Sequence, residues 1–174
     1  KSQIRKNKKE CDIYFDVKAD FSNSGWSVNS YSGTAEEEKN ALKSGQVVSE
    51  IYARNELSIE IMDFSVIQMP YNVKESGTDV TKLMESYKDQ YVNEMTNAGY
   101  KVTDIKQDKM TIAGQTCDGY LISADYSDGG QPINISFVQF FMFKGNYCGY
   151  FTAGSTSQGK AKLILTNHVS KLSE

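Results

Sequence analysis

Histidine, the side chain that most often serves as a general base or metal ligand, occurs once in the chain. His168 falls on an apolar helical stripe between Leu165 and Leu172, a position typical of a histidine at the edge of a core. A single histidine cannot build a multi-histidine metal site, and no Gly-X-Ser-X-Gly nucleophile elbow is present. We therefore expect no catalytic residues of the serine hydrolase type and no metal site.

The three cysteines show no Cys-X-X-Cys spacing, and Cys117 and Cys148 lie in apolar strand patterns where burial disfavours a reactive thiolate. Two-residue turns at Asp128–Gly129 and Gly145–Asn146 would place these two on opposite faces of a sheet, because side chains alternate along strands. We expect no disulfide between them, and a bridge to Cys11 is only slightly more favoured.

No phosphate-binding loop of the Walker or dinucleotide type is present. The segment Asp125–Gly129 superficially resembles a calcium loop, but it lacks the acidic residues at the third and twelfth positions and is explained as a hairpin turn. Asp16 with Asp20, or Glu56 with Glu60, could form carboxylate pairs, yet these residues also fit the solvent-exposed faces of strands and loops. A carboxylate enzyme is therefore the least favoured function.

Aromatic residues near predicted turns and strand ends are stronger candidates for binding. The chain has eleven Tyr, eight Phe and one Trp, and aromatic side chains on loops often line grooves. The alternative is that they cap sheet edges and helix flanks. The candidate binding residues are Trp26, Tyr31, Tyr71 and Tyr126, with Tyr100 and Tyr147 in the same group.

The 174 residues fit one domain, predicted to span residues 11–174 after a flexible basic lead-in at residues 1–10. Net charge is −3, with no basic stripe, so we expect no nucleic-acid partner. No apolar stretch reaches the length of a membrane span. The start at Lys1 is what a cleaved export signal, a trimmed lipid anchor or a removed expression tag would leave.

Alternation of apolar and polar residues predicts strands, and Arg54–Glu56 predicts a hairpin loop that pairs Ile51 with Ile59. A second hairpin is expected to turn at Gly114–Gln115. A short helix is expected within residues 29–45. The predicted strands cover residues 11–18, 26–28, 46–53, 57–64, 110–113, 117–126, 133–143 and 147–153.

A helical stripe that begins after Thr78–Asp79 and stops at Gly99 predicts a helix of about twenty residues, and residues 158–172 predict a second. The strand at 133–143 is apolar on both faces, which is typical of a strand covered on both sides. The fold class is therefore α+β, an antiparallel meander with helices on both faces.

The order of these elements resembles the PsbP-like family, named for an extrinsic photosystem II subunit and shared by a Ran-binding import factor and bacterial secreted lipoproteins. The similarity covers the chain from about Cys11 to Leu172, but Asn23–Ser24 stands where a proline commonly precedes Gly-Trp. It implies an α/β/α sandwich and no family-wide catalytic residues. It rests on Gly25–Trp26, Gly99, Gly114–Gln115, Phe137–Phe141, Gly145–Tyr147 and Tyr150–Thr152.

The missing catalytic patterns, the acidic charge and this resemblance predict a non-enzymatic binding or interaction domain. The resemblance implies the exported ectodomain of a bacterial lipoprotein, extracellular or at the cell surface, with membrane contact only through an upstream lipid anchor. The alternative is an assembly subunit that docks on a larger complex. We expect a monomer without a cofactor, whose protein or small-molecule partner the sequence does not identify.

Overall fold

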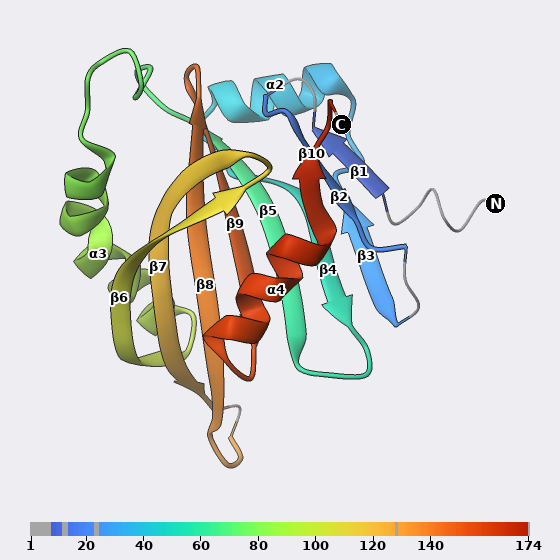
Figure 1. The fold of residues 1–174 in the computed structure, drawn as a ribbon, viewed down its shortest axis with the longest axis vertical. Helices are drawn as coiled ribbons and strands as arrows, with labels where there is room; N and C mark the ends of the chain where they lie inside the picture. Colours follow the sequence, from blue (N-terminus) through green and yellow to red (C-terminus); the bar gives the residue numbers. More distant parts are fainter. Residues whose placement is uncertain (1–7, 12–13, 23–24, 128, 174) are drawn as a thin grey trace.

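A computed structural model describes residues 8–11, 14–22, 25–127 and 129–173 (Figure 1). The elements run in the order β1 (Lys8–Cys11), β2 (Val17–Asp20), β3 (Trp26–Ser30), α2 (Ala35–Lys43), β4 (Val48–Asn55), β5 (Glu60–Gln68), α3 (Val80–Asn97), β6 (Tyr100–Ile112), β7 (Gln115–Tyr126), β8 (Ile133–Lys144), β9 (Tyr147–Ser155), α4 (Gln158–His168) and β10 (Val169–Lys171).

One large antiparallel sheet has the strand order β3-β4-β5-β9-β8-β7-β6. A small sheet, β1-β2-β10, packs with α4 and α2 against one face of it, whereas α3 packs against the other face over β6 and β7 (Figure 1). The predicted α+β class and the helices on both faces are confirmed.

Two apolar cores lie on opposite sides of the large sheet, because its central strands are apolar on both faces. The larger core lies under α4, α2 and the small sheet and contains Phe140 and Leu165. The smaller core joins Met84 and Met95 of α3 to Tyr120 of β7. The sheet is therefore the middle layer of three.

The predicted long helix is confirmed as α3, since the Asp79 side chain caps its start by accepting from Lys82 N at 3.2 Å. Gly99 follows it with a φ of +95°, a conformation that suits glycine at a helix end. The short helix expected within 29–45 is α2, which starts at a capping box between Thr34 and Glu37.

The predicted register of the β4–β5 hairpin is wrong. Ile51 pairs with Phe64, because Asn55 and Glu60 are the last paired residues and the turn spans residues 56–59. The Asn55 side chain holds this longer turn by accepting from Leu57 N at 3.0 Å. Leu57, the first residue of the strand predicted at 57–64, lies in this turn and is 87% exposed.

The expected two-residue turn at Asp128–Gly129 is also wrong, since Tyr126 and Ile133 are the last residues that pair between β7 and β8, and Asp128 itself lies outside the described residues. Pairing shifts by two residues, which leaves every side chain on its predicted face. Cys117 and Cys148 accordingly lie in different cores and carry free thiols, as expected.

The β6–β7 hairpin turns at Ala113 and Gly114, one residue earlier than expected, with φ angles of +50° and +77°. Positive φ at both central residues is typical of the type I′ turn, whose twist matches that of the flanking strands.

The two ends of the chain differ from the predicted elements. A strand starts at Lys8, within the expected lead-in, and residues 1–7 lie outside the described residues. The expected continuous strand at 11–18 is two strands, since β1 ends at Cys11 and β2 begins at Val17, and Phe15 N donates to the Cys11 carbonyl at 3.1 Å between them. Residues 12–13 lie outside the described residues. The last helix ends at His168 rather than near 172, because the next residues pair with β2 as β10.

Candidate binding groove

Helix α3 is held over β6 and β7, at one side of the sheet. The buried Tyr120 hydroxyl of β7 donates to the Met84 carbonyl at 2.5 Å. Thr81 donates to the Asp118 carboxylate at 3.1 Å, and Gln107 of β6 donates to the Thr81 carbonyl at 3.0 Å. These bonds hold the helix over β6 and β7. On the sheet face that α3 covers, β8, β9 and β5 therefore lie beside the helix rather than beneath it.

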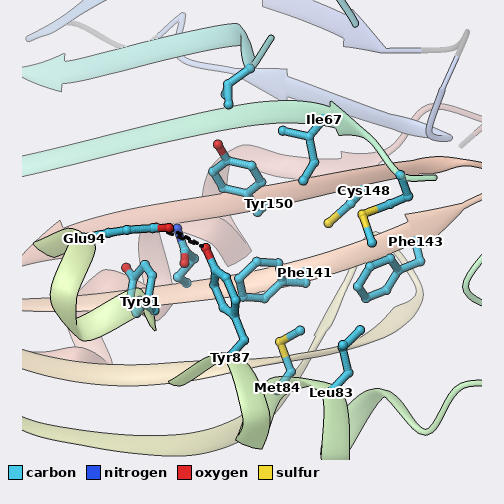
Figure 2. Close-up of a pocket in the computed structure, with 13 residues that line it drawn as sticks. Ile67, Leu83, Met84, Tyr87, Tyr91, Glu94, Phe141, Phe143, Cys148 and Tyr150 are labelled. Carbon is cyan, nitrogen blue, oxygen red and sulfur yellow. Dashed lines mark hydrogen bonds between the residues drawn. The ribbon is translucent and has the colours of Figure 1, made fainter. Parts of the chain in front are cut away.

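A groove of about 310 Å³ opens between α3 and this part of the sheet (Figure 2). Its volume is at the lower end of the range typical of small-molecule sites. We call it the α3 groove. It is lined by Val47, Ile67, Met69, Leu83, Met84, Tyr87, Tyr91, Glu94, Gln139, Phe141, Phe143, Cys148 and Tyr150.

The floor of the groove follows from strand alternation. Residues two apart on β8 point to the same face, so Phe141 and Phe143 lie side by side under the groove, next to Tyr150 of β9 (Figure 2). Burial raises the pKa of the Cys148 thiol to about 12, which makes it a weak nucleophile. The floor is therefore aromatic and chemically inert.

The helix wall carries Tyr87, Tyr91 and Glu94, which share the apolar stripe of α3 at helical spacing. The Tyr87 hydroxyl donates to both Glu94 oxygens, at 3.0 and 3.2 Å, and Gln90 donates to the same carboxylate at 3.2 Å. Burial raises the pKa of both tyrosines, so they are neutral hydrogen-bonding phenols at pH 7.

A second carboxylate stands on the same sheet face, beside Tyr150. Asp63 of β5 accepts hydrogen bonds from the hydroxyls of Ser49, at 2.6 Å, and Ser65. Burial raises the pKa of Asp63, although the two serine hydrogen bonds oppose this rise. Burial, and then the charge of Asp63, raise the pKa of Tyr150 to about 12. The middle of this face is therefore polar and acidic, with a carboxyl group that serine hydroxyls hold in place.

His168 lies far from this groove, at the edge of the larger core, as the sequence predicts. Its ring stacks on Phe21 at 4.2 Å and contacts Trp26 edge-on at 5.2 Å, and Nδ1 donates to the Asp20 carbonyl at 2.7 Å. Within the described residues, no three His, Cys, Asp or Glu side chains gather closely enough to hold a metal ion.

The carboxylates of Asp16 and Asp20 serve local hydrogen bonds. Asp16 accepts from the Ser173 hydroxyl at 3.0 Å, and Asp20 accepts from Ser22 N at 2.9 Å. The Ser22 side chain, and then its backbone N–H, lower the pKa of Asp20. Both carboxylates are thus held by backbone or serine donors at the start and end of β2.

The candidate aromatic residues do not converge on one site. Trp26 packs on the larger core beside Phe21, and the half-buried Tyr31 packs on the same core. Tyr71 lies in the loop after β5, 39% exposed, and Tyr126 contacts Tyr100 at 5.1 Å between ring centres. None of the four lines the α3 groove as the described residues form it, and their part in binding stays a prediction.

Sequence reasoning assigns the residues that do line the groove to the core. It places Tyr87 and Tyr91 on the packing stripe of α3, and Phe141 and Phe143 on a strand covered on both faces. One feature of the sequence indicates that this face of the helix is open. Glu94 falls three residues after Tyr91 on the same stripe, where a charged residue does not suit a closed core.

Comparison with solved structures supports the fold. The chain superposes on the solution structure of cyanobacterial PsbP (CyanoP) from Synechocystis sp. PCC 6803 with a TM-score of 0.52, over 90% of this chain and 86% of that one, at 9% identity. The fold is PsbP-like. So low an identity establishes the shared fold alone.

A second structure, LpqN, involved in cell envelope biogenesis of Mycobacterium tuberculosis, matches with a TM-score of 0.48 and 10% identity, over 88% of this chain and 82% of that one. That similarity is too weak to support an argument. No protein-family model and no curated protein sequence matches the chain. No helix in the described part of this PsbP-like chain is both long and apolar enough to cross a membrane.

Proposed function

We propose that this PsbP-like chain is a non-enzymatic binding domain whose α3 groove holds a small ligand with an apolar or aromatic body. The observation that carries the proposal is the groove itself, an open cavity of about 310 Å³ with an aromatic floor. Apolar walls with a few polar groups are typical of small-molecule sites. The polar groups here are neutral tyrosines and a hydrogen-bonded carboxylate, which suit recognition better than bond breaking.

The other role implied by the family resemblance is docking on a larger complex. Leu57 and Ile59 favour a contact of that kind, since they are 87% and 50% exposed at the tip of the β4–β5 hairpin. These two side chains form a smaller surface than the thirteen residues that line the groove. We therefore place ligand binding first and docking second.

The proposal includes export of the chain and its attachment to the cell surface by a lipid anchor. Its support is the resemblance to the PsbP-like family, which includes secreted bacterial lipoproteins. The test is to treat intact cells of the source organism with a protease and to detect the chain by antibody. Digestion in intact cells is expected, and protection until the cells are lysed would contradict the proposal.

The groove can be tested with N-phenyl-1-naphthylamine, an uncharged dye that fluoresces in apolar sites. Leu83→Trp adds a large ring at the groove wall, and Leu163→Trp makes the same change on α4, where Leu163 is 55% exposed and outside the groove. We expect saturable dye binding by the wild type and by Leu163→Trp, and at least tenfold weaker binding by Leu83→Trp.

Thermal unfolding of both variants controls for damage to the fold. Equal dye binding by the two folded variants would contradict a site in the groove. A wild-type protein that binds no dye would remove the ligand-binding role and leave docking as the better proposal.

A further inference from the structure

The charges of the α3 groove are all of one sign. Glu94 is the one charged residue among the described residues that line it, and Asp63 adds a second carboxylate on the same sheet face. In the described part of the chain, neither carboxylate forms an ion pair with Lys, Arg or His. Their partners are the hydroxyls of Tyr87, Ser49 and Ser65 and the amide of Gln90.

Tyr150 links the two carboxylates. It lies across from Ser65 on the neighbouring strand, two residues from Asp63, and the charges of both Asp63 and Glu94 act on its hydroxyl. In Figure 2, its ring and that of Tyr87 rise from opposite sides of the groove, with Glu94 at one end. A group bound between them would meet aromatic faces and negative charge together.

We propose that the occupant of the α3 groove is a small organic cation, an amine or quaternary ammonium carried on an apolar body. This inference rests on the proposed function, since it assumes that the groove binds a ligand, and it adds the charge of that ligand. The apolar body lies over Phe141 and Phe143, and the cationic group lies toward Glu94 and Tyr87.

Charge complementarity favours a cation over the other occupants. The negative faces of aromatic rings attract ammonium groups, and a carboxylate at the same place strengthens the attraction. An anionic ligand would meet the Glu94 carboxylate, which no cation neutralises in the described part of the chain. A neutral ligand would strip water from Glu94 without replacing the lost stabilisation.

Three probes with one apolar body test the charge directly: 4-phenylbutylamine, 4-phenyl-1-butanol and 4-phenylbutyrate. Their affinities are measured by isothermal titration calorimetry at pH 7 and low ionic strength. We expect the amine to bind at least tenfold more tightly than the alcohol, and the carboxylate to bind most weakly. Leu83→Trp should weaken the binding of the amine, which locates it in the groove.

Glu94→Gln keeps an acceptor for Tyr87 and removes the charge, and Glu94 is exposed, so the variant should fold. We expect it to reduce the preference for the amine over the alcohol to less than threefold. The matched control is Glu85→Gln, a carboxylate on the same helix that lies outside the groove and pairs with Lys88. It should keep the full preference.

Equal affinity for the amine and the alcohol, or tighter binding of 4-phenylbutyrate, would overturn the inference that the ligand is a cation. The groove would remain a binding site. Unchanged preference in Glu94→Gln would also overturn it. If none of the three probes binds while the naphthylamine dye does, the cation inference alone fails. If the dye fails too, the proposed function fails with it.

Discussion

Gly119 of β7 pairs with Phe140 of β8 in the large sheet. A Cβ atom at this position would lie 1.9 Å from the Gln139 carbonyl oxygen and 2.8 Å from Phe140 Cα. Both are main-chain atoms of the paired strand, so no side-chain rotation can relieve the contact. Gly119→Ala therefore forces β7 and β8 apart in the interior of the sheet.

The size of the effect follows from these distances. Cβ atoms essentially never approach other heavy atoms within 3.0 Å, so the strands must separate by about 1 Å. Overpacking of a core costs about 1–3 kcal/mol, and each weakened ladder hydrogen bond adds about 0.5–1.5 kcal/mol. We expect Gly119→Ala to lower the free energy of unfolding by about 3 kcal/mol.

Gly130→Ala is the matched control for this change. A Cβ atom at Gly130 would have no other heavy atom within 4 Å, and the φ of this residue is outside the left-handed region. The substitution should change stability by less than about 1 kcal/mol, and in the stabilising direction, because alanine restricts the unfolded chain. Urea unfolding of both variants measures the difference. A Gly119→Ala protein within about 0.5 kcal/mol of the wild type would refute the reasoning from close approach.

Two further predictions concern the helix contact and the carboxylates. Tyr120→Phe removes the buried hydrogen bond to Met84 and should cost about 1 kcal/mol in urea unfolding; no loss would show that the bond does not hold α3. Burial raises the pKa of Asp63 in the folded protein above its value in the unfolded chain. The contribution of Asp63 to stability therefore falls as pH rises from the unfolded pKa through the folded pKa. Relative to the wild type, Asp63→Asn should accordingly be more stable at pH 7 than at pH 3.5. Asp20, whose pKa is lowered by the Ser22 hydrogen bonds, should behave oppositely, with Asp20→Asn less stable at pH 7 and the loss shrinking as pH falls; parallel profiles for the two variants would contradict both assignments.

Local signals predict the elements that depend on local chemistry. The cap at Asp79, the stripe of α3 and the stop at Gly99 are set by neighbours in sequence, and the structure has all three. Register is harder to predict, because it depends on which residue ends a turn. At the β4–β5 hairpin, the side chain of Asn55 lengthens the turn and takes Leu57 out of the strand, although Leu57 continues the alternating pattern.

The groove could not be predicted in the same way, because it depends on where α3 lies across the sheet. Tyr120 and Met84 are 36 residues apart, and their hydrogen bond helps to place the helix over β7. From sequence, the same tyrosines and phenylalanines suit either a closed core or a groove wall. Only the sideways position of α3 decides between the two.

The polar middle of the uncovered face bears on the choice between ligand binding and permanent docking. Gln139 is buried but donates to Thr152 at 2.9 Å, and Asp63 is held by two serines on the same face. A permanent apolar partner over this surface would remove the remaining water from Asp63 without supplying a counter-charge, which is costly for a carboxylate. A surface built this way favours an occupant that brings its own charge and can leave again, as a small cationic ligand does.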